Sequence, residues 1–388
     1  MLNFADLIII LFVIAAAVRG YKYGFLQQGF SLIGFWAGII LTALIILPLS
    51  KQFDEGVSAG GIIFLIILGA LAGLWVGEAV GHKLAVLFKR IKLGWLNKAG
   101  GVVLNSSLTL LLIWLSANLL NAAPVYELNR QLAGSQIIRA IDNKLQSPPS
   151  LLAEVQQLLR LGDFPQVFIG LEPSQTEPVI PPGSESVRAV TTRLQPSVVQ
   201  IEGNGCGGIK NGSGFVAASD LIITNAHVVA GLSSVFVNDT AGRKRATLVH
   251  FDPNLDIAVL RVQGLSGPPL ALNTDVAARG QTGAVLGYPN GGNYTGVASA
   301  VLARFTASGR DIYGGGRVNR TVYSIQTTVV PGNSGGPFVN LDGQVLGVIF
   351  ASSTTNNGVG YAITAQEADN SLKKASSQVA SVSSGNCD

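Results

Sequence analysis

The chain has 388 residues and a formal net charge of +4, with 12% charged and 48% hydrophobic residues. Soluble domains usually carry about 25% charged residues, so the composition excludes an ordinary soluble enzyme. Two distant cysteines and three scattered histidines have no metal-ligand spacing, and no glycine run ends in the Lys-Ser/Thr of a phosphate loop. We therefore expect neither a metal nor a cofactor.

The apolar excess lies before residue 122, in four long stretches: Phe4–Val18, Phe25–Leu49, Gly60–Val80 and Gly101–Leu120. A transmembrane helix needs about 20 apolar residues. The first stretch is shorter and contains Asp6, but it lacks the basic start and cleavage site of a signal peptide. The sequence therefore predicts an all-α membrane domain over residues 1–122 with four transmembrane helices.

Basic residues are unevenly distributed between these stretches. Arg19 and Lys22 separate the first two, and five Lys or Arg residues between Lys83 and Lys98 separate the last two. The middle loop balances Lys51 with Asp54 and Glu55. The positive-inside rule places the first and third loops in the cytoplasm and both termini outside it. The net positive charge thus reflects topology and does not predict nucleic-acid binding.

Glycine recurs every four residues in the third stretch, at Gly69, Gly73, Gly77 and Gly81, and Gly34 and Gly38 repeat the spacing in the second. Small residues at this spacing let membrane helices approach closely. The sequence leaves open whether these helices pack within one chain or between chains.

Residues 123–186 form a connector of different character. Apolar residues from Leu128 to Leu145 recur with a helical period. Pro149 is placed to begin a second helix over Leu151–Leu161. The segment from Glu172 to Ser186 contains four prolines, which favours an extended, semi-rigid spacer.

Three segments of the C-terminal part carry nucleophilic chemistry. His227 follows the apolar run Leu221–Ile223, Asp256 precedes another such run, and Ser334 lies within Gly332–Pro337. A hydroxyl, an imidazole and an orienting carboxylate form a serine triad, and the order His-Asp-Ser is that of chymotrypsin-type enzymes. Other carboxylates, Asp220, Asp239 and Asp252, fit less well, because Asp252 precedes a proline and no apolar run.

These motifs, together with Gly212–Phe215, resemble the trypsin-like serine proteases, especially the Deg/HtrA type, over about residues 187–365. The resemblance implies an all-β double antiparallel barrel over 187–388. By it, His227 is the general base, Asp256 orients it, Ser334 is the nucleophile, and the N–H groups of Gly332 and Ser334 form the oxyanion hole. By it also, Thr328 floors the primary pocket and Gly358 and Gly360 lie on its walls. Because Thr328 carries no charge, we expect no preference for Arg or Lys.

Cys206 and Cys387 lie at the two edges of this domain. In an oxidising exterior we expect them to form a disulfide that ties the C-terminal tail to the first barrel. The alternative is two unrelated thiols.

Asp6 and the segment Arg19–Phe25 resemble the CvpA-like membrane family. A CvpA-like unit fused to a trypsin-like domain resembles the actinobacterial membrane proteases of acid resistance. This implies a membrane-anchored serine endopeptidase that cuts protein or peptide substrates in the cell envelope, with a role in acid or oxidative stress and possible self-cleavage in the connector. One alternative is a general envelope quality-control protease without a PDZ domain. Another is a membrane channel or scaffold with an accessory sensory protease.

Overall fold

The computed structural model describes residues 3–50, 59–120, 125–145, 165, 167–169, 172, 177–206 and 208–387. The chain divides into two compact units, Met1–Leu115 and Ser116–Asp388. The predicted second connector helix over Leu151–Leu161 lies outside the described residues.

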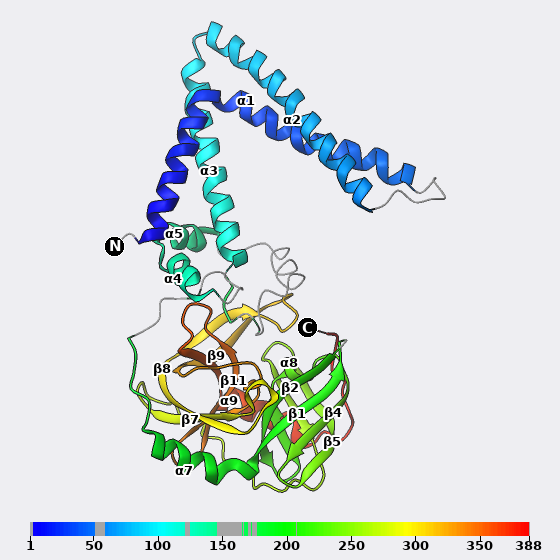
Figure 1. The fold of residues 1–388 in the computed structure, drawn as a ribbon, viewed down its shortest axis with the longest axis vertical. Coiled ribbons are helices and arrows are strands. Elements are labelled where there is room, and N and C mark those ends of the chain that lie inside the picture. The colour runs from blue at the N-terminus through cyan, green and yellow to red at the C-terminus, as the bar shows by residue number, and fades with distance from the viewer. Residues whose placement is uncertain are drawn as a thin grey trace. The chain divides into compact units, whose positions relative to one another are not determined.

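Unit 1 consists of long apolar helices, α1 (Phe4–Ser50), α2 (Ala59–Arg90) and α3 (Gly94–Leu120) (Figure 1). Among the described residues, three helices are long and apolar enough to cross a membrane. The expected number was four. The first two apolar stretches lie on either side of a kink at Gly24 and are counted together as α1, so the predicted interruption between them is a kink without a separate loop.

The bend in α1 has a specific cause. Gly24 adopts a left-handed φ of 76°, which glycine tolerates without the steric cost of a side chain. The bend frees the N–H of Leu26, and Asn97 at the start of α3 accepts it through Oδ1 at 2.8 Å. Before the bend, Gly20 approaches Gly101 of α3 so closely that a Cβ on Gly20 would lie 2.2 Å from the Gly101 carbonyl oxygen. Asn97 and Gly101 therefore hold α3 against the first half of α1.

The glycine stripe of α2 packs against the second half of α1. A Cβ on Gly73 would lie 2.1 Å from the carbonyl oxygen of Gly34, and one on Gly38 would lie 2.1 Å from that of Gly69. Only glycine permits this backbone contact, so the stripe acts within one chain. Next to it, Gln27 donates a hydrogen bond to Glu78 at 3.0 Å, which gives this membrane carboxylate a polar partner.

Unit 2 begins with short connector helices, α4 (Tyr126–Gly134) and α5 (Gln136–Leu145). The periodic segment from Leu128 to Leu145 is thus two helices. The break lies at Ser135, which has an extended backbone and whose hydroxyl accepts the N–H of Ile138 at 3.2 Å. A serine in this position caps a new helix and stops the previous one. Helix α7 (Ser184–Leu194) and the 3₁₀ turn η1 (Gln195–Ser197) then lead into the first barrel.

Two closed antiparallel barrels follow, which confirms the predicted fold class (Figure 1). The first has the strand order β1-β2-β3-β6-β5-β4 and the second the order β10-β11-β12-β9-β8-β7. The strands of the first are β1 (Val198–Gly205), β2 (Gly208–Ala218), β3 (Leu221–Thr224), β4 (Leu232–Asp239), β5 (Gly242–Asp252) and β6 (Ile257–Arg261). Those of the second are β7 (Thr282–Gly287), β8 (Thr295–Arg310), β9 (Arg317–Gln326), β10 (Pro337–Asn340), β11 (Val345–Ser352) and β12 (Val359–Thr364).

Each barrel has its own apolar core, and a further cluster joins them. Ile201 and Leu260 are buried in the first core, and Phe338 and Ile349 in the second. The joining cluster contains Phe215 of β2 and other side chains from both barrels. Loops at this junction are therefore carried by two rigid scaffolds that are packed against each other.

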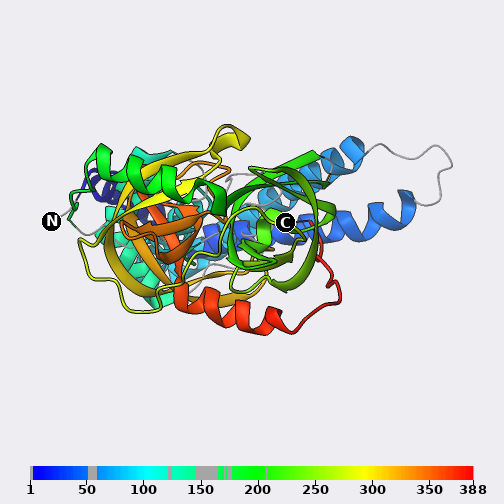
Figure 2. The same cartoon turned by 90° about the horizontal axis from the view of Figure 1, so that it is seen from below.

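Helix α9 (Ala365–Ser376) follows β12 and lies against strands of both barrels (Figure 2). The tail beyond it returns to the first barrel, where the N–H of Val382 bonds the Leu248 carbonyl at 2.9 Å. The tail ends at the disulfide between Cys206 and Cys387, which have a Cα–Cα distance of 5.6 Å.

Candidate active site

His227 lies in α8 (Ala226–Val229), a single helical turn directly after β3, and Asp256 lies in the turn between β5 and β6. The side chain of Asp256 is fully buried, and His227 is 9% exposed. One carboxylate oxygen of Asp256 lies 2.7 Å from His227 Nδ1, and the other accepts the His227 backbone N–H at 2.9 Å. A carboxylate at Nδ1 favours the tautomer in which Nε2 is free to accept a proton.

The backbone of Asp256 is unusual as well. Its φ of 62° lies in the left-handed region, which Asp adopts more readily than most residues. Asn225 Nδ2 donates to the Asp256 carbonyl at 2.9 Å and holds this turn in place. The segment before His227 thus fixes the backbone of its carboxylate partner.

The other carboxylates that the sequence offered are engaged elsewhere. Asp252 accepts the N–H groups of Asn254 and Leu255 in its own turn. Asp239 pairs with Lys244, and Asp220 pairs with Arg261. Of these four carboxylates, Asp256 is the one that lies against the imidazole of His227.

Ser334 lies in the loop between β9 and β10 and is 4% exposed. Its carbonyl accepts the N–H of Ser213 at 2.8 Å, and the next residue, Gly335, donates its N–H to Ile349 at 2.8 Å. A Cβ on Gly335 would lie 2.2 Å from the Ser213 carbonyl oxygen and 3.1 Å from Asn225 N. The serine loop therefore lies against the segment that carries His227. Among the described residues, no hydrogen bond joins the Ser334 hydroxyl to His227, and such contacts often tighten only with substrate.

Two backbone donors near Ser334 remain available. Within the described part of the chain, no protein acceptor takes the N–H of Gly332 or of Ser334. The peptide groups beside Gly332 are held from behind: Asn290 N–H donates to the Pro331 carbonyl at 2.7 Å, and Ser213 Oγ donates to the Gly332 carbonyl at 2.6 Å. Preorganised, unpaired N–H groups beside a nucleophile are suited to stabilise an oxyanion.

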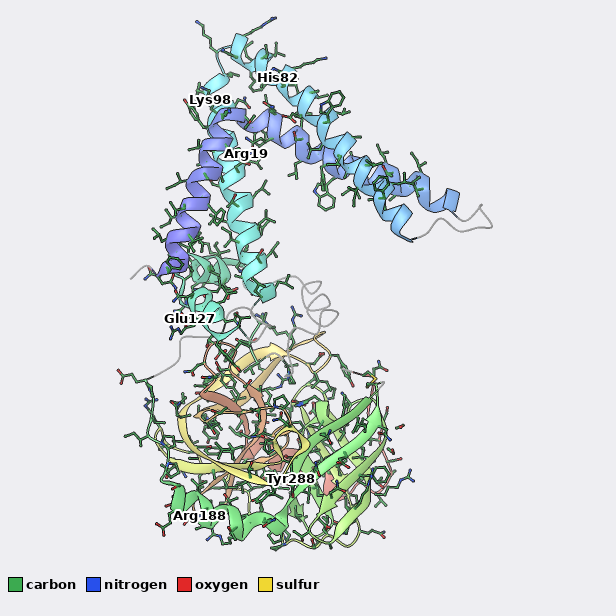
Figure 3. All side chains as sticks on the ribbon, in the orientation of Figure 1. Arg19, His82, Lys98, Glu127, Arg188 and Tyr288 are labelled. Carbon is green, nitrogen blue, oxygen red and sulfur yellow. A yellow bond between two sulfur atoms is a disulfide. The ribbon has the colours of Figure 1, made fainter. Side chains whose placement is uncertain are left out.

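Ser213 links these elements. Its hydroxyl also accepts the N–H of Tyr288, which follows β7 and is labelled in Figure 3, at 2.9 Å. Its carbonyl accepts the Thr224 hydroxyl at 2.7 Å. The motif Gly212–Phe215 therefore ties the serine loop to the first barrel.

The segment expected to form the floor of the primary pocket exposes Thr328, the residue that the spacing from Ser334 had indicated. Thr328 is exposed, whereas Val329 is buried beside Gly360, where an added Cβ would lie 2.4 Å from Val329 Cγ2. The Gly358 carbonyl accepts the N–H of Thr327 at 2.9 Å. Spacing from Ser334 points to Thr328, but the direction of each side chain depends on the loop backbone. Val329 and Thr327 had no sequence signal of their own.

A buried arginine supports the Asp256 turn and was also missed in the sequence. Arg320 of β9 is 1% exposed, and it donates to the carbonyls of Asn254 at 2.7 Å and Arg310 at 2.8 Å. Burial lowers the pKa of its guanidinium, and the charge of Asp256 opposes this shift. An isolated arginine in β9 looks like a surface residue, because its buried acceptors come from distant turns.

The disulfide lies close to the end of α8, the helical turn that carries His227. A Cβ on Gly231, close after α8, would lie 2.7 Å from Cys206 Sγ, and Gly231 N–H donates to the Ser384 carbonyl at 3.1 Å. The expected link between the tail and the first barrel is present. Among the described residues, no group of three His, Cys, Asp or Glu side chains is arranged to hold a metal ion.

Comparisons with known proteins agree with this arrangement. The trypsin-like peptidase domain family matches residues 212–348, and the colicin V production protein family matches residues 5–146. Serine protease Rv3671c of Mycobacterium tuberculosis is 34% identical over 387 residues, which is 95% of both chains. The crystal structure of the active form of the Rv3671c protease matches with a TM-score of 0.52 and 40% identity, over 56% of this chain and 98% of that one.

A probable periplasmic DegP-like serine endoprotease of Halomonas elongata is 39% identical over 160 residues, which is 39% of this chain and 32% of that one. The resemblance to the Rv3671c protein spans both the membrane helices and the barrels. The chain therefore belongs to the family of membrane-anchored serine proteases that includes Rv3671c, and it is a serine endopeptidase with a CvpA-like membrane domain.

Proposed function

We propose that His227, Asp256 and Ser334 are the catalytic triad of this endopeptidase. Two features of the site support the assignment. One buried carboxylate engages both Nδ1 and the backbone N–H of His227, and the adjacent serine loop carries two unpaired N–H groups. The first feature gives a base in the correct tautomer, and the second gives an oxyanion hole.

The reaction follows from these positions. Ser334 Oγ attacks the scissile carbonyl while His227 Nε2 takes its proton, and Asp256 stabilises the imidazolium. The N–H groups of Gly332 and Ser334 donate hydrogen bonds to the substrate oxygen and stabilise the negative charge that develops on it. His227 then protonates the leaving amine. In the second half of the reaction His227 takes a proton from water, which attacks the acyl-enzyme, and the proton returns to Ser334 as the acid product leaves.

The proposed primary pocket lies between Thr327–Val329 and Gly358–Gly360. Because Val329 lies against Gly360, the pocket accepts a small or medium apolar side chain at the residue before the cut. The segment Thr327–Val329 carries no charged side chain, so Arg and Lys are poor substrates at that position. Protein and peptide chains of the cell envelope are the substrates.

The protease unit lies on the extracytoplasmic side. Lys98, at the start of α3, lies 4.5 Å from the ring centroid of Tyr21 in α1, so the predicted third loop reaches the first, which carries Arg19 and Lys22. Figure 3 labels Arg19, His82 and Lys98 in this part of unit 1. From there α3 runs antiparallel to the first half of α1, since Asn105 donates to the Ala16 carbonyl at 3.3 Å. The positive-inside rule then directs the end of α3 outward, where a disulfide persists.

Residues 1–122 serve as the membrane domain, 123–186 as the connector and 187–388 as the protease domain. The enzyme acts in resistance to acid or oxidative stress, and it cuts its own connector to release the protease. The supports for this role are the outward orientation and the disulfide beside α8.

A membrane-impermeant fluorophosphonate tests both the triad and the orientation. Applied to intact cells that make the full chain, it labels the parent, whereas the Ser334→Ala chain stays unlabelled and Asp256→Asn reacts far more slowly. Failure to label the folded parent after permeabilisation would refute the triad. Labelling that requires permeabilisation would refute the outward orientation.

Cells that carry Ser334→Ala separate the roles of the protease. Stabilisation of a few envelope proteins indicates a regulatory protease, and accumulation of many misfolded ones indicates quality control. If cells with the Ser334→Ala chain survive acid as well as the parent, whereas cells that lack the chain do not, the membrane scaffold is the favoured role. Unchanged processing of a Ser334→Ala connector would exclude self-cleavage.

A further inference from the structure

Glu172 of the connector has a buried carboxylate that is bonded to the protease barrel. The residue is only 3% exposed. Its Oε1 accepts the hydroxyl of Ser353 at 2.6 Å and that of Tyr361. Its Oε2 accepts the N–H of Thr354 at 2.8 Å and its hydroxyl at 3.0 Å. All these donors lie in or beside the turn between β11 and β12.

A buried carboxylate is costly unless its charge is matched by hydrogen bonds. Here the donors come from the turn after β11 and from Tyr361 of β12, and the acceptor comes from a segment far earlier in the chain. The barrel closes through its own strand pairs without this contact. The carboxylate therefore fixes the turn and is not needed to build the barrel.

Further contacts dock the connector at the same place. Phe168 stacks on Phe305, with 5.8 Å between ring centroids, and packs edge-on against Tyr361 at 5.5 Å. Asn129 of α4 donates to the Thr354 carbonyl at 3.0 Å. Two separate parts of the connector thus bind the turn that begins at Ser353.

Hydrogen bonds continue from this turn to the proposed pocket. Ser353 Oγ, which donates to Glu172, accepts the N–H groups of Thr355 at 3.1 Å and Asn356 at 3.0 Å. Asn356 Oδ1 accepts the N–H of Gly358 at 2.9 Å. The Gly358 carbonyl in turn accepts the N–H of Thr327 at 2.9 Å. The path from Glu172 to the pocket segment Thr327–Val329 is continuous.

We propose that Glu172 is a positioning residue for substrate binding, which holds the Ser353–Gly358 turn as one wall of the primary pocket. This rests on the proposed pocket. The connector is then part of the substrate site as well as a tether. A cut on the N-terminal side of Glu172 keeps the wall in place, whereas a cut between Glu172 and α7 separates the carboxylate from the barrel chain and weakens substrate binding.

Full-length variants test this role by comparing peptide hydrolysis with labelling of Ser334. Glu172→Gln keeps the shape of the side chain but removes the charge, and Glu177→Gln is the matched control on an exposed connector residue. Charge-assisted hydrogen bonds contribute about twice as much as neutral ones. We expect Glu172→Gln to lower kcat/KM for peptides about 10-fold to 100-fold, mainly through KM, and to change relative rates among peptides that differ before the cut. Labelling by a small fluorophosphonate, which needs the triad but not the pocket wall, stays within about twofold.

Tyr361→Phe provides a second, milder variant, because it removes one donor to Glu172 and keeps the packing. We expect the same rise in KM with a smaller size. Parental kcat/KM in both variants would overturn the proposal, as would equal losses of hydrolysis and labelling, which indicate general structural damage. A parent chain that hydrolyses nothing and takes no label refutes the triad instead, so the two failures are distinguishable.

Discussion

Ser213 is the residue whose removal best separates fold from catalysis. Its fully buried hydroxyl donates to the Gly332 carbonyl at 2.6 Å and accepts the Tyr288 N–H at 2.9 Å. In Ser213→Ala both partners lose their hydrogen bond in a buried place. Each unsatisfied group costs about 1–3 kcal/mol, so the two together should lower the stability by about 2–6 kcal/mol.

The catalytic loss follows from Gly332. Removal of an oxyanion-hole donor costs about 100-fold to 1,000-fold in kcat. In Ser213→Ala the Gly332 N–H is loosened but not removed, because Asn290 still holds the Pro331 carbonyl. We therefore expect kcat to fall about 10-fold to 100-fold, with KM changed by less than about twofold.

The assay is steady-state hydrolysis of a peptide, with thermal inactivation measured in parallel. Ser197→Ala is the matched control, because Ser197 is also buried and donates to a carbonyl, that of Pro268 at 2.7 Å, outside the Ser334 loop. It should lose stability and keep its kcat. If Ser213→Ala loses no more kcat than Ser197→Ala, the link from Ser213 to the oxyanion hole is refuted.

Further predictions follow from other contacts. Arg320→Met leaves the Asn254 carbonyl without its donor and shifts the Asp256 turn. We expect kcat to fall about 10-fold to 100-fold, which is less than the roughly 10,000-fold that the triad carboxylate contributes. The control Arg317→Met, at an exposed arginine, should keep the parental kcat. Burial lowers the pKa of His250, with Asp252 opposing this and Lys374 adding to it. Around and below the ordinary histidine pKa of about 6.5, His250 therefore binds more protons in the unfolded state than in the folded one, and the folded state loses stability as the pH falls through that range. His250→Gln should therefore lose less thermal stability between pH 7.5 and 5 than the parent. Gly73→Val inserts a side chain against the Gly34 carbonyl and should lower the aggregation temperature of the micelle-bound chain, whereas Gly29→Val, where a Cβ meets nothing within 4 Å, should not; equal effects would contradict the close packing. Cys387→Ser opens a 181-residue loop and should remove up to about 5 kcal/mol of stability and lower peptidase activity, which an unchanged inactivation temperature and turnover would disprove.

Local chemistry explains what could be predicted. Membrane-spanning helices can be predicted from long apolar runs, since every residue in such a run faces lipid or another helix. The barrel fold followed from the motifs around His227, Asp256 and Ser334, whose order and spacing are those of one enzyme class. The sequence predicted a basic loop between the first two apolar stretches, but it did not predict that the interruption is a kink at Gly24 within α1. Its left-handed backbone is stabilised by Asn97, which lies far away in the chain.

The sequence by itself determined a membrane-anchored serine protease, because nucleophile, base and carboxylate each lie in short motifs with a recognisable neighbourhood. Only the tertiary structure decided which groups support them. Ser213, Arg320 and Glu172 each form hydrogen bonds to atoms that are distant in the sequence. Such contacts leave no periodic or local pattern, because their partners meet only once the two barrels have closed and the connector has docked.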